Sequence, residues 1–473
     1  MDTTTVRVEA DFIGSRHIPR DSYWGIHTAR AVENFPITGQ TVAQMPEMIR
    51  ALAHVKKAAV AANTQLGVIE PAVAAAITAA CDDLLAGQLH DQFVVDVIQG
   101  GAGTSTNMNA NEVIANRALQ HIGAQQGDYH LIHPNDHVNA SQSTNDVYPT
   151  ALRLAVYAGV ERLLQAMASL RAAFGAKARE FHAVLKIGRT QLQDAVPMTL
   201  GQEFAAFATM IGEDEARLRE ARALITEVNL GATAIGTGIN APAGYCDLVV
   251  PLLARFSGIP VVQAENLIEA TQDTGAFVQL SGVLKRVATK LSKISNDLRL
   301  LSSGPQAGFG DILLPARQAG SSIMPGKVNP VIPEAMNQVA FEVIGNDLMV
   351  TMASEAGQLQ LNAFEPLMGW ALHKSIAHLA SACKTLQTNC VEGIQANHAV
   401  LSKRVAESVT LVTALNPIIG YEQASRIAKT ALATGNTIAS TAEGLGIMSA
   451  AEMMVLLVPE NLTQPIRLGT QNR

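Results

Sequence analysis

The chain has 473 residues, and its 34 Lys and Arg against 41 Asp and Glu leave a formal net charge of −7. A chain of this length can bury a large core without disulfide or metal staples, and a mildly acidic balance argues against nucleic acid or an anionic membrane as its main partner. Only 16% of the residues are charged, below the roughly 25% of typical soluble domains. We therefore expect extensive buried surface, of the kind that an oligomer provides.

The sequence carries no mark of export or of membrane insertion. Its start, MDTTTVRVEAD, lacks the basic and apolar regions of a signal peptide. We find no uninterrupted apolar run of about 18 residues, the length that a transmembrane helix needs. The four cysteines are too few and too scattered for a disulfide framework. We expect a cytoplasmic protein with buried free thiols.

The first part of the chain, residues 1–140, combines turn-rich segments with short predicted helices around 46–66, 71–87 and 109–121. The middle part differs, because its apolar residues recur every 3.5 positions over long stretches: 156–174, 204–228 and 277–298. That period is typical of long helices that lie nearly parallel with interlocking side chains. Beyond residue 396, turns containing Gly or Pro separate short helices.

These patterns predict an all-α protein with three domains. We expect an N-terminal mixed helical domain at 1–140, a central long-helix bundle at 141–396 and a small C-terminal helical domain at 397–473.

Three short polar segments, 100–109, 139–146 and 188–194, stand out in this apolar chain. Each precedes or opens a predicted helix, and ordinary N-capping explains any one of them taken alone. Three in one chain indicate more, because hydroxyls, amides and backbone N–H groups at helix starts form sites for anions. Short neutral donors of this kind suit carboxylates.

The fourth polar segment, GSSIMPGKVNP at 320–330, gives the strongest indication of a binding site. Gly320 and Gly326 are candidate hinges, Lys327 supplies a positive charge for a carboxylate, and Asn329 supplies an orienting donor. A mobile surface loop with ordinary turn chemistry is the alternative interpretation. The residues alone lead to a site for a small dicarboxylate, closed by a glycine-hinged loop.

Other chemistries find little support. The histidines between 121 and 137 match no standard zinc spacing, and residues 100–103 lack the Lys-Ser/Thr ending of a phosphate-binding loop. Ser321 does not lie in the G-x-S-x-G motif of a serine hydrolase. We predict no metal and no nucleotide cofactor.

The polar segments together resemble the aspartase/fumarase superfamily. The resemblance rests on GSSIMPGKVNP and on four further motifs in the same order as in the family, and it covers nearly the whole chain. These motifs are GAGTSTNMNANEVIANRA at 101–118, HPNDHVNASQSTND at 133–146, GRTQLQDAVPMTLGQEF at 188–204 and NLGATAIGTGIN at 229–240.

Within the superfamily the chain is more similar to the ammonia-lyase (aspartase) branch than to the class II fumarases. Fumarases carry His at the position of Gln191 and Thr at that of Val196, and they read Ser-Ser-Asn-Asp at 143–146, where this chain has Ser-Thr-Asn-Asp. Two departures from the family pattern concern the substrate: Gln306 replaces a usual Arg, and residues 361–366 differ from the aspartase form.

The resemblance implies an all-helical homotetramer with a central bundle donated by four subunits and active sites shared between three of them. It implies a carbon–nitrogen lyase that removes ammonia from L-aspartate by reversible anti elimination, through an aci-carboxylate intermediate, and yields fumarate. This chemistry requires no metal and no organic cofactor.

The resemblance also assigns roles to ten residues. Ser321 is the general base, Asn145 lies near the amino group, and Gln191 orients the leaving amine. The β-carboxylate is surrounded by Thr104, Ser143, Thr144 and Ser322, and the α-carboxylate is held by Thr190, Lys327 and Asn329.

Three alternatives stay open at this stage. The chain is a fumarate hydratase in the first, and a related lyase that acts on an N-substituted aspartate in the second. In the third it is a catalytically silent helical tetramer, which the intact Ser321, Lys327 and Asn329 disfavour.

Overall fold

The structure is a computed structural model that describes residues 5–456 and 458–464. It is mainly helical, and the strands in the described residues form four two-stranded sheets, so the predicted all-α class is confirmed. No described helix is both long enough and apolar enough to cross a membrane. The chain divides into two compact units. The first comprises Met1–Leu164, Ala216–Ala288 and Phe341–Ala380, and the second Gln165–Glu215, Thr289–Ala340 and Ser381–Arg473.

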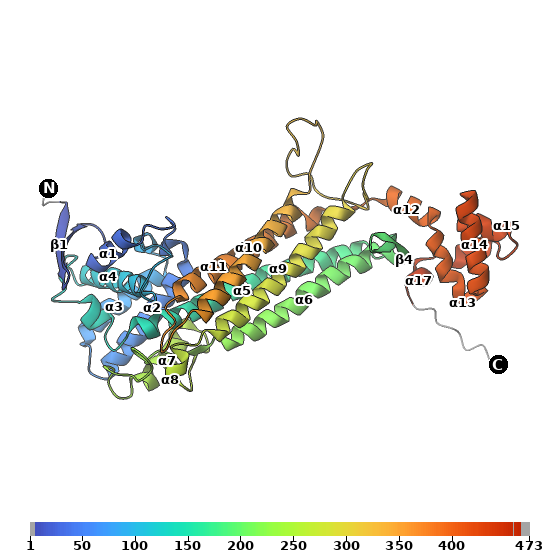
Figure 1. The fold of residues 1–473 in the computed structure, drawn as a ribbon. Coiled ribbons are helices and arrows are strands. Elements are labelled where there is room, and N and C mark those ends of the chain that lie inside the picture. The colour runs from blue at the N-terminus through green and yellow to red at the C-terminus, as the bar shows by residue number, and fades with distance from the viewer. Residues whose placement is uncertain (1–4, 457, 465–473) are drawn as a thin grey trace. The chain divides into compact units, whose positions relative to one another are not determined.

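Five long helices have residues in both units. Figure 1 labels them: α5 (Thr144–Glu180), α6 (Leu200–Leu224), α9 (Gly275–Leu301), α10 (Val331–Glu355) and α11 (Glu365–Asn389). The residues on the predicted apolar stripes of 156–174, 204–228 and 277–298 are buried, as the 3.5-residue period requires. The stripe at 204–228 extends beyond its helix: Ile225 and Val228 are buried, but they follow the end of α6 at Leu224.

The first unit also holds several shorter elements: β1 (Val6–Asp11), β2 (Gly14–Pro19), α1 (Ile26–Asn34), α2 (Pro46–Gln65), α3 (Pro71–Leu85), α4 (Thr104–His121), β5 (Glu227–Val228), α7 (Tyr245–Ser257), β6 (Val262–Gln263) and α8 (Leu267–Ala270). Both α2 and α3 begin with proline, whose fixed φ suits the first helical turn. Helix α2 packs against α3 and α7, and α3 against α4, so α2 lies at the centre of this core.

The second unit adds a β-hairpin and the C-terminal helices: β3 (Leu185–Thr190), β4 (Gln193–Thr199), β7 (Ile312–Leu313), β8 (Gln395–Ala396), α12 (His398–Glu407), α13 (Asn416–Ile419), α14 (Tyr421–Thr434), α15 (Ile438–Gly444), α16 (Ala450–Leu456) and α17 (Pro459–Leu462). Helix α12 packs on β3. The short C-terminal helices have an apolar core of their own, which includes Leu415, Ile427 and Ala442.

One lysine is fully buried in the core of the first unit. Lys56, on α2, is 0% exposed, and its Nζ donates to Asn139 Oδ1 at 2.9 Å and to Gln142 Oε1 at 3.0 Å. Both acceptors are neutral amides. Burial therefore lowers the pKa of Lys56 to about 7, although the charge of nearby Asp146 opposes the shift.

This burial predicts a pH dependence of stability. The unfolded lysine binds its proton up to a pKa of about 10.5 and the folded one only up to about 7, so the unfolded state holds more protons between these values. The free energy of unfolding should therefore rise with pH across this window. Denaturant titrations of Lys56→Met should lack this component, whereas Lys57→Met, one residue along α2, should keep it. If the free energy of unfolding rose with pH equally in the wild type and in Lys56→Met, Lys56 would not be the source of the pH dependence.

Candidate active site

Two helix starts in the first unit bring the first two polar segments together. Helix α4 begins at Thr104, after Gly103 in left-handed backbone, and α5 begins at Thr144. Asn107, on the first turn of α4, donates through Nδ2 to Thr144 Oγ1 at 3.0 Å. A Cβ at residue 103 would lie 2.3 Å from the ring of Tyr148, so only glycine fits here. Adjacent helix N-termini provide a favourable environment for an anion.

The start of α5 is anchored to the 229–240 segment by a buried carboxylate. Asp146 is 0% exposed and accepts backbone N–H groups from Ser143 at 2.9 Å, Gly231 at 2.9 Å and Thr233 at 3.0 Å. Burial raises the pKa of Asp146 to about 6, against the lowering effect of these three donors. Asp146 therefore fixes the backbone of the predicted substrate-binding segment at Ser143 and joins it to the 229–240 segment at Gly231 and Thr233.

The predicted site residues of this unit reach the surface in part. Thr104 is exposed, and Ser143, Thr144 and Asn145 are half-buried. Asn145 Nδ2 donates to Ala234 O at 2.8 Å. Its Oδ1 has no hydrogen-bond partner among the described residues, and such an oxygen is a suitable acceptor for an ammonium group.

The third polar segment forms a hairpin turn in the second unit. The segment precedes the long helix α6, as predicted, but the structure also pairs Thr190 with Gln193 and makes Gln191 and Leu192 a two-residue turn, which was not predicted. Both turn residues have positive φ, 53° and 62°, as a right-handed hairpin twist requires. Gln191 is thus presented at an exposed tip.

A second buried carboxylate holds this hairpin. Asp311 is 0% exposed, and Arg189 on β3 donates to it from Nη1 at 2.7 Å and from Nη2 at 3.3 Å. Lys186 Nζ lies 3.5 Å from the same carboxylate, and Arg404 on α12 also donates to it. The residue before Thr190 therefore has a fixed position.

The fourth segment forms an exposed loop closed at its base by hydrogen bonds. Gly320 N donates to Lys327 O at 2.7 Å, and Asn329 Nδ2 donates to Gly320 O at 2.8 Å. Within the loop, Ser321 Oγ accepts two backbone N–H groups, from Ile323 at 3.1 Å and from Met324 at 2.9 Å. Hydrogen bonds donated to an oxygen favour its negatively charged form.

The charged side chain of this loop is free of protein anions. Lys327 is exposed and forms no ion pair with a described residue. Together with Asn329 it lines a cavity of about 720 Å³, whose wall also includes Arg299, Ser302 and Asn397. Gln306, which stands where the family usually has Arg, is also exposed.

The ten predicted site residues are divided between the two units. Thr104 and residues 143–145 belong to the first unit, and the other six belong to the second.

Most residues with strained backbone dihedrals lie in the polar motif segments. Positive φ in a residue other than glycine costs of order 1 to 3 kcal/mol and is typical of functional sites. Six of the eight such residues in the described parts of the chain lie in the motif segments: Ala102, Ser141, Gln191, Leu192, Thr233 and Asn240.

Three supporting residues were missed as site residues. Asn107 and Asn139 lie inside the polar segments, but their sequence does not tell which amides bind substrate and which bind protein. Lys56 falls in the Ala-rich run of α2, where a lysine normally marks an exposed face. Its only sequence signal is a position among buried neighbours such as Leu52 and Ala59.

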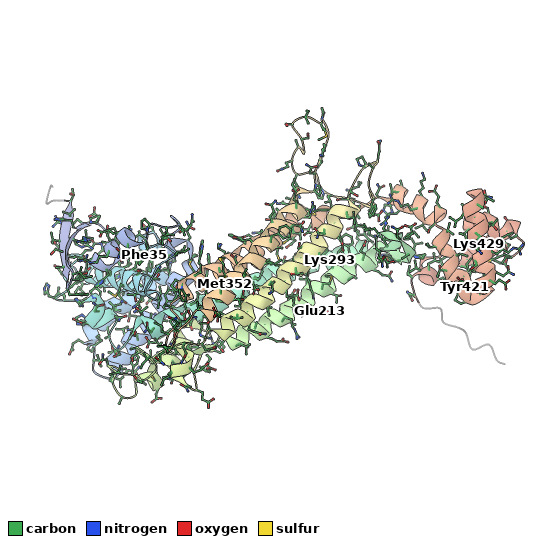
Figure 2. All side chains as sticks on the ribbon, viewed as in Figure 1. Phe35, Glu213, Lys293, Met352, Tyr421 and Lys429 are labelled. Carbon is green, nitrogen blue, oxygen red and sulfur yellow. The ribbon has the colours of Figure 1, made fainter. Side chains whose placement is uncertain are left out.

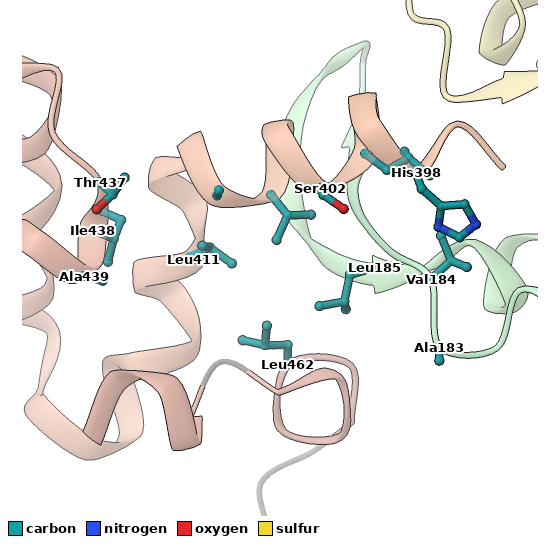
Figure 3. Close-up of a pocket in the computed structure, with 13 residues that line it drawn as sticks. Ala183, Val184, Leu185, His398, Ser402, Leu411, Thr437, Ile438, Ala439 and Leu462 are labelled. Atoms are coloured by element: carbon teal, nitrogen blue, oxygen red, sulfur yellow. The ribbon is translucent and has the colours of Figure 1, made fainter. Parts of the chain in front are cut away.

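A separate cavity of about 620 Å³ lies near the C-terminal helices of the second unit (Figure 3). Its lining is mostly apolar, with Leu185, Leu411 and Leu462 among the contributors, and it contains none of the predicted site residues. Among the described residues, no group of three His, Cys, Asp or Glu side chains is arranged to hold a metal ion.

Comparison with known proteins agrees with the motifs. Residues 14–345 match the family described as "Lyase", and residues 411–464 match "Fumarase C C-terminus". The chain is 57% identical to an aspartate ammonia-lyase of Pseudomonas aeruginosa, over 97% of each chain.

Two solved structures are similar in fold. A fumarate lyase:delta crystallin of Brucella melitensis, bound to cobalt, has a TM-score of 0.94 and 57% identity, covering 97% of this chain and 100% of that one. A class II fumarase of Schistosoma mansoni has a TM-score of 0.91 and 33% identity, covering 98% and 100%. The resemblance read from the motifs is therefore confirmed: the chain belongs to the aspartase/fumarase family of lyases.

Proposed function

We propose that this chain is an aspartate ammonia-lyase, which converts L-aspartate reversibly to fumarate and ammonia. The observation that carries the proposal is Ser321, whose Oγ accepts two backbone N–H groups in a loop that also bears Lys327, which forms no ion pair within the described parts of the chain. The identity of 57% with the Pseudomonas aeruginosa aspartate ammonia-lyase supports the choice of substrate.

Ser321 is the general base in this proposal. A serine hydroxyl is a very poor base in water, so its alkoxide needs stabilisation before it can take the C3 proton of aspartate. The N–H groups of Ile323 and Met324 supply part of this stabilisation, and the positive charge of Lys327 in the same loop adds to it. Exclusion of water by the glycine-hinged loop strengthens both effects.

The negative charge left at C3 spreads onto the β-carboxylate as an aci-carboxylate. Thr104, Ser143, Thr144 and Ser322 donate to it, and two of them open helices α4 and α5, whose N-termini favour negative charge. Ser143 Oγ accepts the N–H of Asn145 at 3.2 Å, which leaves its own proton for the substrate.

The other end of the substrate meets the remaining residues. Lys327, Thr190 and Asn329 hold the α-carboxylate, and Asn145 Oδ1 accepts from the amino group. Gln191, at the hairpin tip, orients the amine as it leaves. These steps use side chains and backbone alone, so the proposed chemistry needs no cofactor.

Two substitutions separate the base from the carboxylate ligand. Ser321→Ala should lower kcat by at least about 10³, because proton abstraction loses its acceptor, while KM changes less. Lys327→Ala should raise KM strongly and also lower kcat, since it holds a carboxylate in both ground and transition states. Steady-state kinetics with aspartate measure both. A Ser321→Ala variant with most of the wild-type rate would rule out the serine base.

Fumarate hydratase is the second candidate, because the Schistosoma mansoni class II fumarase shares the fold at 33% identity. The glutamine at position 191 argues against it. Hydration requires a group that moves a proton on water near neutral pH, which histidine does and glutamine cannot. An amine leaves from its ammonium form without such help.

Absorbance of fumarate distinguishes the two activities. L-aspartate should yield fumarate and ammonia, and L-malate should yield negligible fumarate. D-aspartate should fail, because inversion at C2 misplaces the amine relative to Ser321. Malate turnover as fast as aspartate turnover would favour the hydratase instead.

We also propose that the chain forms a homotetramer in the cytoplasm. Helix α10 buries one face, yet Phe341, Leu348 and Met352 on another are 63%, 61% and 63% exposed, and Ile344 is exposed as well. Their spacing of three and four residues forms an apolar stripe, which identical subunits can cover. Figure 2 labels Met352 on this helix. The free cysteines suit a reducing compartment.

Shared sites predict complementation between inactive chains. Ser321→Ala and Thr144→Ala homotetramers should each be nearly inactive, and co-refolded mixtures should regain part of the activity, because some sites receive both intact segments. Light scattering of the wild type should give the mass of four chains. A monomer, or a mixture no more active than its components, would contradict shared sites.

A further inference from the structure

A chain of hydrogen bonds in the first unit leads from the buried Lys56 to Thr144. Lys56 Nζ donates to Asn139 Oδ1 at 2.9 Å, Asn107 Nδ2 donates to the same Oδ1 at 3.2 Å, and Asn107 Nδ2 also donates to Thr144 Oγ1 at 3.0 Å. Lys56 and Asn107 are 0% and 1% exposed, whereas Asn139 and Thr144 are half-buried, so the chain runs from the core of the unit to its partly exposed site residues.

The direction of each bond follows from the lysine. An ammonium group only donates, so Asn139 must present its oxygen to Lys56, and its Nδ2 turns to Gln142 O at 3.4 Å. Asn107 can satisfy that oxygen only with its amide nitrogen, whose second N–H then reaches Thr144. A neutral Lys56 is compatible with the same pattern, because it still has two N–H groups for Asn139 and Gln142, but only the ammonium form excludes the reverse one.

This orientation is held at a cost. Asn107 Oδ1 is buried and has no hydrogen-bond partner among the described residues, so the loss of its hydration is not compensated. Lys56 is buried against neutral amides, where an apolar side chain of similar length would avoid the desolvation of an ammonium group. Costs of this kind are expected where a site must be held in one arrangement.

We propose that Lys56, Asn139 and Asn107 are positioning residues that make Thr144 a hydrogen-bond donor to the substrate. Because Thr144 Oγ1 accepts from Asn107, its own O–H points away from the protein network and is available to the β-carboxylate. This inference rests on the proposed function for the identity of the carboxylate. It adds that the proton direction of Thr144 is set from the core of the unit.

A fixed donor serves the reaction, because negative charge on the β-carboxylate grows as the C3 proton leaves. A hydroxyl already aimed at that charge needs no reorientation in the transition state. A threonine hydroxyl that could rotate freely would donate to protein acceptors for part of the time.

The test reverses the polarity of one side chain. Asn107→Asp keeps the shape but replaces both N–H donors by an acceptor, so Thr144 should donate to residue 107 rather than to substrate. We expect kcat for aspartate to fall by about 10- to 100-fold, the value of one hydrogen bond to a charged group. Asn111→Asp is the matched variant, since Asn111 donates to the same Asn139 oxygen at 3.2 Å but not to Thr144. Its loss should be clearly smaller.

A double-mutant cycle shows whether Asn107 acts through the hydroxyl. Thr144→Val should itself lower kcat, and adding Asn107→Asp to it should lower kcat at most about 3-fold further. The inference would be overturned if the kcat losses of Thr144→Val and Asn107→Asp multiplied in the double variant. Equal kcat losses in Asn107→Asp and Asn111→Asp would overturn it as well. If Asn107→Asp does not fold, Lys56→Met replaces it in the cycle, with Lys57→Met expected to match wild type.

Failure of the proposed function is visible separately. It would appear as a wild type that does not convert aspartate, and the same variants are then compared by calorimetric binding of succinate, a saturated dicarboxylate. Weaker succinate binding in Asn107→Asp than in Asn111→Asp would still support the positioning role, and equal binding would refute it.

Discussion

Two buried aspartates, one in each unit, hold two of the segments that bear predicted site residues. Asp146 accepts three backbone N–H groups and so joins the start of α5 to the 229–240 segment. Asp311 instead gathers cations, among them Arg189 next to the hairpin tip. A carboxylate that is buried and fully bonded is costly to disturb, because any partner removed leaves charge without compensation. Segments of irregular backbone therefore acquire the rigidity that helices have by themselves.

This anchoring explains how strained residues persist at the site. Gln191 and Leu192 occupy a turn that normally favours Asn and Gly, and Thr233 has positive φ beside the Asp146 carboxylate. The strain of each costs of order 1 to 3 kcal/mol, which the surrounding bonds must offset. Exposed loops without such anchors would relax. The site loop at 320–330 is held at its base alone, and its glycines leave the rest able to move.

Sequence periodicity was enough to predict three of the five long helices, α5, α6 and α9, because an apolar stripe must face a core wherever it occurs. The helices expected around 46–66 and 71–87 agree with α2 and α3 for the same reason. The hairpin at 185–199 was not predicted, since neither Gln191 nor Leu192 is a turn former and tertiary bonds through Arg189 impose its geometry. Lys56 was hidden as well: its burial depends on amides more than 80 positions away in the chain. The substrate roles of the ten residues stay predictions.

The choice of neutral donors around the proposed β-carboxylate has a physical logic that Lys56 completes. A cation in direct contact would already bind the substrate carboxylate strongly in the ground state, and that part of the binding lowers KM without raising kcat. Hydroxyls bind the ground-state carboxylate less strongly, and their hydrogen bonds strengthen as charge accumulates on the acceptor. Their weakness is that a hydroxyl both donates and accepts. A lysine placed two amides behind Thr144 removes this ambiguity, since its ammonium group can only donate, and the direction of each following hydrogen bond is then fixed.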